Sequence, residues 1–338
     1  MARVFNDAKK LVLFFACALL MMQTGKAALA QPTAPAENPY TQRYWLLRSA
    51  STLTGVDWTY LAAVDQYERT LNQANPNTRP KHEGLIAIHY TAEDWAGALN
   101  PNKEDDSPYT IAVFGGVGKD GNGDGKADRN DDMDRLMTMA LHLASFGPSE
   151  DDIREGLWTH YQSDRSVRRI EQFRNIIHHF QSLDLFEHAF PLPIHANYSY
   201  RSTWGAGRSY GGKRIHEGTD IFAGYGVPVK STCYGVIEVM GWNRFGGWRI
   251  GIRDLNNVYH YFAHLSGFNK EWQEGSIVKP GDVIGWVGSS GYGKPGTQGK
   301  FPPHLHYGMY RDSGSIDWSF DPYPYLRKWE REERAKRR

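Results

Sequence analysis

Two short runs, far apart in the chain, contain residue types that suit one metal ion. The first is His216-Glu-Gly-Thr-Asp220, and the second is His304-Leu-His306. Side chains two apart on a strand point to the same face, so His304 and His306 should project together. His216 and Asp220 are an even number of residues apart, so on a strand they would also face the same side, and Gly218 lets the chain bend around an ion. Two His and one Asp are typical ligands of a catalytic zinc ion with one open position. The sequence therefore predicts a strand-rich fold that brings both runs together.

A third histidine, His264, lies in the apolar run 261–265, which predicts a buried strand. The order of the three motifs resembles the lysostaphin/LytM-type zinc endopeptidases of peptidase family M23, which cut peptide bonds in bacterial peptidoglycan. The resemblance covers roughly residues 200–322. It implies a zinc site made by His216, Asp220 and His306. It also implies that His304 and His264 line the cleft, where one takes the proton of water or stabilises the oxyanion and the other orients or protonates the leaving amine.

The flank Trp204-Gly-Ala-Gly-Arg208 and the run from His216 to Phe222 are similar to the sporulation branch of this family. That branch includes L-Ala–D-Glu endopeptidases acting on stem peptides of the spore cortex. Peptidoglycan is therefore the expected partner. A non-catalytic peptidoglycan-binding activator is the alternative, although such relatives typically lose ligands and this chain keeps all five positions.

The N-terminus predicts export. Lys9-Lys10 precede the apolar run Leu11–Met22, and an Ala-Leu-Ala site ends at Ala30, so residues 1–30 are typical of a signal peptide. The run is too short for a spanning helix, and we expect no stable membrane insertion after cleavage. An uncleaved anchor is the alternative. The expected location is secreted or cell-wall associated, including the forespore intermembrane space.

Composition excludes one class of partner and one kind of crosslink. The formal net charge of +1 lacks the basic footprint of a nucleic-acid-binding protein. Cys233 would be the single cysteine after signal cleavage, so no internal disulfide can form.

The pattern along the chain predicts an α+β protein of two domains. A Pro-rich linker at 31–40 precedes a helical domain at 41–185, with helices expected after Asp57 and over 131–146, 150–162 and 167–182. A linker at 186–200 leads to a zinc metallopeptidase domain at 201–325, followed by a charged tail at 326–338. Short runs with Gly-rich turns predict an all-β antiparallel sandwich or open barrel for this domain. The strands are expected at 227–231, 235–240, 248–253, 258–264, 276–278, 282–287 and 304–310.

One loop of the helical domain has the spacing of an EF-hand calcium loop. Its candidate ligands are Asp120, Asn122, Asp124, Lys126, Asp128 and Asp131, with Gly125 at the turn. The last position is Asp rather than the usual Glu, and a solvated Asp/Gly-rich turn is the alternative.

The helical domain also resembles the lysozyme-like lytic transglycosylases, in the runs from Trp58 to Glu68 and from Gly84 to Trp95. The resemblance implies Glu68 as general acid/base, which requires a raised pKa. Arg69 would oppose that rise. A degenerate, glycan-binding domain is therefore expected, with a lytic transglycosylase and a surface ion pair at Glu68 as alternatives.

Overall fold

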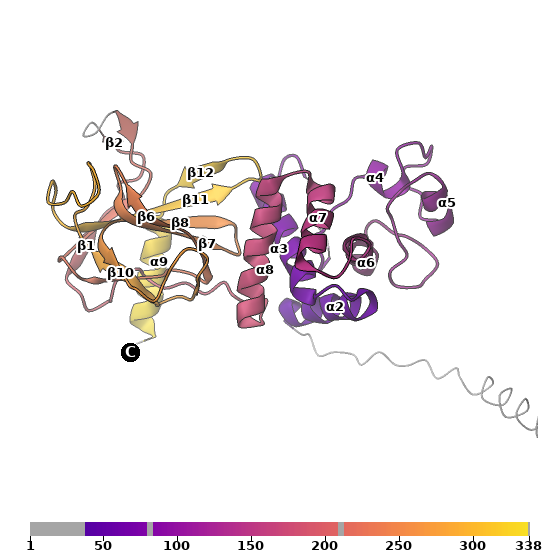
Figure 1. The fold of residues 1–338 in the computed structure, drawn as a ribbon, viewed down its shortest axis with the longest axis horizontal. Coiled ribbons are helices and arrows are strands. Elements are labelled where there is room, and N and C mark those ends of the chain that lie inside the picture. The colour runs from indigo at the N-terminus through magenta and orange to yellow at the C-terminus, as the bar shows by residue number, and fades with distance from the viewer. Residues whose placement is uncertain (1–37, 80–83, 209–212, 337–338) are drawn as a thin grey trace, which may run out of the picture. The chain divides into compact units, whose positions relative to one another are not determined.

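The computed structural model describes residues 38–79, 84–208 and 213–336. The predicted signal peptide and the linker up to residue 37 lie outside these ranges. Residues Tyr40–Arg338 form one compact unit (Figure 1). In the part of the chain that the structure describes, no helix is both long and apolar enough to cross a membrane.

The N-terminal half of this unit is helical, and the sequence explains where its helices begin. Asp57 accepts the backbone N–H of Thr59 at 2.8 Å and starts α3. Ser149 and Asp152 form a reciprocal capping box at α7. The helices are α2 Pro39–Thr54, α3 Trp58–Ala74, α4 Ala92–Ala96, α5 Pro108–Val113, α6 Asp132–Ala144, α7 Glu150–Tyr161 and α8 Asp164–Phe180.

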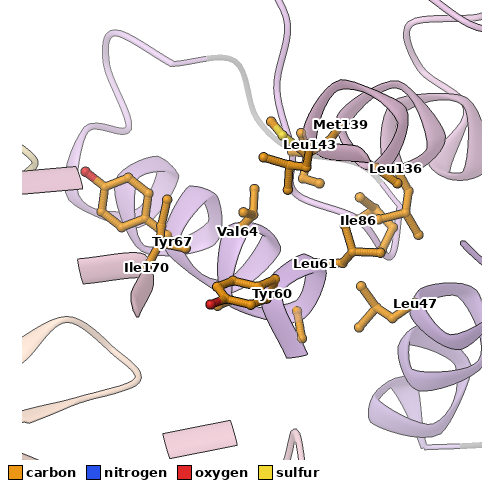
Figure 2. Close-up of a cluster of buried hydrophobic side chains, with 14 of the residues drawn as sticks. Leu47, Tyr60, Leu61, Val64, Tyr67, Ile86, Leu136, Met139, Leu143 and Ile170 are labelled. Atoms are coloured by element: carbon orange, nitrogen blue, oxygen red, sulfur yellow. The ribbon is translucent and has the colours of Figure 1, made fainter. Parts of the chain in front are cut away.

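A hydrophobic core joins these helices around α3, as Figure 2 shows. Leu61 and Val64 of α3 lie in the same cluster as Leu136 and Met139 of α6 and Ile170 of α8. The spacing of the apolar residues on each helix puts them on one face, which is why the helices pack together. This core extends into the sheet, because it also contains Val236 and Leu255.

The C-terminal half is an antiparallel sheet with a second core. Its main path runs β1-β4-β11-β8-β7-β6-β9, β10 pairs with β5 and β8, and β12 pairs with β11. The α+β prediction is confirmed at this level. The strands are β1 Tyr198–Tyr200, β2 Gly207–Arg208, β3 Arg214–Ile215, β4 Thr219–Ala223, β5 Pro228–Lys230, β6 Gly235–Asn243, β7 Gly247–Asp254, β8 Val258–Phe268, β9 Ile277–Val278, β10 Val283–Val287, β11 His304–Asp312 and β12 Asp317–Phe320.

The predicted charged tail at 326–338 is largely part of a helix that packs on the sheet. It forms helix α9, Tyr323–Ala335, and this helix is not solvated on all sides. Leu326 and Trp329 are buried in the core of the sheet. Tyr198 and Tyr200 donate their hydroxyls to Glu330 at 2.8 and 2.6 Å. The apolar residues among the charges therefore dock this helix on the sheet. They were not predicted from the sequence because most residues of the segment are charged.

Candidate metal centre and active site

Three predicted ligands converge on one point. His216 Nε2 lies 2.9 Å from His306 Nδ1, and each of these nitrogens lies 3.1 Å from Asp220 Oδ1. Ligand atoms about 2 Å from a tetrahedral zinc ion would lie roughly this far apart. The three atoms therefore form a ready-made site for one small divalent cation.

The backbone explains this convergence. Strands β4 and β11 pair so that Asp220 lies opposite His306. His216 precedes β4, so it reaches the site from a loop, and the shared-strand reasoning for His216 and Asp220 is wrong. Gly218 has a different role from a simple bend, because a Cβ there would lie 2.7 Å from Cε1 of His306 and 2.6 Å from the carbonyl of Tyr307. Only glycine lets the His216 loop approach the ring of His306 so closely.

Hydrogen bonds and burial prepare the ligands for a cation. His216 Nδ1 lies 2.9 Å from the carbonyl of Thr203, which can only accept, so Nδ1 carries the proton and Nε2 keeps its lone pair. Burial lowers the pKa of His306, which keeps this imidazole neutral. Burial alone would raise the pKa of Asp220, but its contacts with the imidazoles of His216 and His306 outweigh burial and hold that pKa well below its usual range. Neutral imidazoles and an ionised carboxylate are the states that bind metal.

His304 and His264 lie beside this site with their rings fixed. His304 Nδ1 donates to the carbonyl of Pro302 at 2.9 Å, and His264 Nδ1 donates to that of Ser290 at 2.8 Å. Their ring centroids are 4.8 Å apart. His304 Nε2 is buried, lacks a hydrogen-bond partner among the described residues, and lies 3.7 Å from Asp220 Oδ1. An unpartnered buried lone pair beside the ligand set is suited to accept a proton from water.

His264 reaches the site through a break in strand β8. Between the pairs Ile250–Phe262 and Trp248–Leu265, the chain advances two residues on β7 and three on β8. This extra residue is a β-bulge, and His264 has a positive φ of 63°. His260 and His264 share parity in the sequence, yet His260 lies in the core while His264 lines the groove. Regular alternation would place both rings on one face, and the bulge reverses this alternation.

A groove of about 350 Å³ opens at the ligands. It is lined by His216, His264 and His306, and it also contains two cations that the sequence interpretation did not single out, Arg208 and Arg214. Arg208 pairs with Oδ2 of Asp220, the carboxylate oxygen that faces away from the histidines. The only sequence signal for Arg208 was its place in the Trp-Gly-Ala-Gly-Arg flank.

The predicted calcium loop has a different organisation. Asp120 accepts the N–H groups of Gly123 and Gly125 at 2.7 and 2.9 Å, and Asp131 caps α6. The side chains of Asn122, Asp124 and Asp128 likewise accept backbone N–H groups two residues ahead, and Lys126 pairs with Asp106. Neither of the two groups of metal-binding side chains found in the described ranges lies in this loop. The geometry matches the Asp/Gly-rich turn and gives calcium no support.

Glu68 is buried rather than on the surface, so the surface ion pair is wrong. Its carboxylate pairs with Arg79 at 2.5 Å and accepts the hydroxyl of Tyr161 at 2.9 Å. Arg69 instead reaches Asp65 and the carbonyl of Leu85. Burial raises the pKa of Glu68 despite Arg79, contrary to the expected effect of Arg69. A glycosidic oxygen would have to displace these contacts to reach it.

Comparison with known proteins identifies the family. Residues 214–318 match the profile of peptidase family M23. This range contains all five predicted zinc-site and cleft residues: His216, Asp220, His264, His304 and His306. The chain is also 57% identical over 298 residues to the L-Ala–D-Glu endopeptidase of Bacillus subtilis, covering 88% of this chain and 91% of that protein. The chain belongs to peptidase family M23.

Other relatives of this M23 peptidase match a smaller share of the chain. Lysostaphin of Staphylococcus simulans is 36% identical over 115 residues, which cover 33% of this chain and 22% of that protein. The solved catalytic domain of lysostaphin from the same organism is 31% identical, with a TM-score of 0.31, and the match covers 39% of this chain and 92% of that domain.

Proposed function

We propose that this M23 peptidase is a zinc-dependent peptidoglycan endopeptidase that hydrolyses the L-Ala–D-Glu bond of stem peptides. The observation that carries the zinc assignment is the convergence of His216, Asp220 and His306 on one point at 2.9–3.1 Å. The bond assignment is supported by the 57% identity to the L-Ala–D-Glu endopeptidase of Bacillus subtilis, which extends over both halves of the chain. A spore-cortex setting and export through residues 1–30 remain part of the proposal.

When bound, zinc would be held by His216, Asp220 and His306 and would supply Lewis-acid chemistry, which polarises a carbonyl and makes water more acidic. The chain's own residues perform the proton transfers. His304 accepts a proton at Nε2, because its Nδ1–H is fixed on Pro302. It then donates that proton to the leaving amine. His264 keeps its Nε2 toward the groove, since its Nδ1–H is bound to Ser290.

Burial and the neighbouring histidines lower the pKa of His264 to about 3. A neutral His264 can orient water or the amine, but it cannot stabilise the oxyanion as a cation.

The two arginines of the groove suit a glutamate next to the scissile bond. A glutamate has two carboxyl groups and continues the peptide through one of them, so one carboxylate remains near the scissile nitrogen. Arg208 and Arg214 are the cations that line the groove, whereas Glu217 is its acidic residue. Arg214 lies over the rings of Phe245 and Tyr292, with 5.9 and 5.6 Å between its Cζ and the ring centroids. We assign the glutamate carboxylate to Arg214, whose guanidinium is held in the groove by these two rings and by a hydrogen bond to the hydroxyl of Tyr292.

Mass spectrometry of digested peptidoglycan tests the reaction. The protein from residue 31 onward should release new N-terminal glutamate and new C-terminal alanine, and a chelator or His216→Ala should abolish both. Intact stem peptides in walls that still retain the zinc-loaded protein would instead support the non-catalytic, peptidoglycan-binding activator. Anhydromuramyl ends would instead support a transglycosylase acting through Glu68.

Paired substrates test the arginine assignment. Stem peptides with a free glutamate carboxylate should be cleaved faster than the same peptides amidated at that carboxylate. Arg214→Gln should remove most of this preference while leaving cleavage of the amidated peptide nearly unchanged. Lys270→Gln is a control that removes an exposed positive charge outside the groove lining. Equal losses on both substrates would show that Arg214 has no role in recognising the carboxylate.

For residues 41–185 we propose a lysozyme-like, glycan-binding domain, followed by the 186–200 linker and the peptidase domain at 201–325. Trp158, which is half exposed, lines a depression of about 490 Å³ on α7 and α8. An aromatic face beside polar groups is suited to bind a sugar. In the inactive His216→Ala background, Trp158→Ala should reduce retention by purified walls, whereas Trp45→Ala should not. Equal retention of the three proteins would remove the proposal.

A further inference from the structure

A second group of metal-binding side chains lies in the core, outside the groove. It consists of His188, Asp254 and His260, whose ligand atoms all lie within 4.8 Å of one another. His260 Nε2 is 3.2 Å from Asp254 Oδ2, and His188 Nε2 is 3.8 Å from the same oxygen. The three residues come from the segment after α8, the end of β7 and the start of β8. These distances are near those of the first site, and the donor set, two His and one Asp, is the same.

Neighbouring groups hold each donor toward the shared point. Asp254 Oδ1 accepts the N–H groups of Asn256 and Val258 at 2.9 and 2.8 Å, which leaves Oδ2 facing the histidines. His188 stacks on Trp329 of α9, with 4.8 Å between centroids and 3° between planes. Packing thus fixes both groups before any ion binds.

His260 is oriented from its other nitrogen. Its Nδ1 lies 2.7 Å from the hydroxyl of Tyr307 and 3.0 Å from that of Thr232. A hydroxyl can accept from Nδ1–H, and this tautomer directs the lone pair of Nε2 at Asp254. Hydrogen bonds to the far nitrogen are the usual way in which proteins orient histidine ligands.

The charge balance of the group also favours a cation. Among the described residues, the ion pairs of Asp254 are only to His188 and His260. The adjacent Arg253 is paired with Glu238 and Asp317. A buried carboxylate is costly without compensation, and a divalent cation held between Oδ2 and the two imidazoles would offset that cost.

We propose that His188, Asp254 and His260 bind a second, structural zinc ion. All three lie away from the groove lining, so the ion would link the segment after α8 and helix α9 to the sheet and leave the reaction to the first site. Cys233 pairs with His188 across an isolated β-bridge. The group of donor atoms that lie within 4.8 Å of one another does not include its sulfur, so the ligand set excludes it.

Metal stoichiometry tests this site independently of the proposed reaction. The full mature chain, loaded with zinc and then freed of excess metal, should contain two zinc ions by elemental analysis and native mass spectrometry. His188→Ala and His216→Ala should each contain one, and the double variant none. His195→Ala, a control at an exposed histidine of the same segment, should retain both.

The single variants separate the two proposals and report folding. His188→Ala should still bind the first zinc ion, which shows that the site around His216 is folded, and it should keep its activity on peptidoglycan. Zinc should stabilise His216→Ala against heat but should not stabilise the double variant. One zinc ion in the wild type together with none in His216→Ala would show that the second group is only a hydrogen-bonded cluster. Two ions in His188→Ala would overturn the ligand assignment.

Discussion

A buried ion network between helix α8 and the sheet gives a strong prediction for stability. Asp312 of β11 is fully buried and pairs with Arg165 and Arg169 of α8 at 3.0 and 2.9 Å. Arg169 also pairs with Glu238 of β6. Removal of one partner from a buried ion pair leaves the other charge without compensation, and typically costs about 3–5 kcal/mol. We expect Asp312→Ala to lower the free energy of unfolding by this amount.

The same helix offers a matched control. Arg154 and Glu171 form an ion pair at 2.6 Å, but Arg154 is more than half exposed, and water screens the pair. Such surface pairs contribute roughly 0.2–1 kcal/mol, so Glu171→Ala should have a small effect. Guanidinium denaturation followed by tryptophan fluorescence at pH 7 would measure both variants. Equal effects, both below about 1 kcal/mol, would refute the reasoning that burial makes the Asp312 network strong.

The pH dependence provides a further check on the network. Burial opposes ionisation of Asp312, but hydrogen bonds from Arg169, Gly314 and Arg165 outweigh it and lower its pKa. A lowered pKa means that the folded state binds the proton less tightly than the unfolded chain. The stabilisation is therefore complete above the ordinary Asp pKa of about 4 and is lost as the pH falls through the folded value. The difference between wild type and Asp312→Ala should be constant from neutral pH down to about 5 and should shrink below about 4.

Three other variants test the site and the helical half. His304→Ala should keep zinc at the first site and lose turnover at least 100-fold, as expected for a missing acid–base residue, whereas His216→Ala should lose both zinc and turnover. Elemental analysis would measure the zinc and peptide release the turnover. An active His304→Ala would overturn the role of His304. Gly218→Ala should weaken zinc binding by roughly tenfold or more in a chelator competition, because its Cβ would displace the ring of His306, and unchanged affinity would contradict the packing argument. Glu68→Gln should be at least as stable as wild type at pH 7. The raised pKa of Glu68 means that wild type loses stability as the pH rises above about 4.5. A variant that is less stable than wild type in denaturation at pH 7 would show that the ionised pair with Arg79 dominates.

The sequence predicted much of the chain because local signals agreed with the fold. Apolar spacing and the cap at Asp57 predicted α3, and the predicted range 150–162 matches α7. All seven predicted strand ranges overlap observed strands. The two-residue spacing of His304 and His306 also predicted correctly that they share a face, since β11 is regular over these residues. Where the backbone is regular, periodicity in the sequence is enough to assign a face.

The sequence was a weaker guide where tertiary contacts decide the structure. Arg79, which pairs with Glu68, and Tyr161, which hydrogen-bonds to it, are distant in sequence, so neither its burial nor its raised pKa could be inferred from Arg69. The oxygen spacing of the 120–131 loop fits a turn as well as an ion site, because the same side chains can accept backbone N–H groups. Trp329 docks α9 on a surface that only the folded sheet provides.

Strand β8 shows most clearly what sequence parity cannot predict. It supplies His260 to the buried group and His264 to the groove, and regular alternation would have placed both rings on one face. The bulge at His264 separates them, with a positive φ that costs a non-glycine residue about 1–3 kcal/mol. This strain can be measured with two variants that both lack the imidazole.

Glycine is normally worse than alanine in a strand, by about 0.5–1 kcal/mol, because it loses more backbone entropy on folding. At His264 the order should reverse, since glycine adopts positive φ without the steric penalty that a Cβ incurs. We expect His264→Gly to unfold at higher denaturant concentration than His264→Ala in the presence of a chelator, with both variants inactive on peptidoglycan. If alanine gave the more stable protein, the left-handed backbone at His264 would carry no strain, and the separation of the two histidines would need another cause.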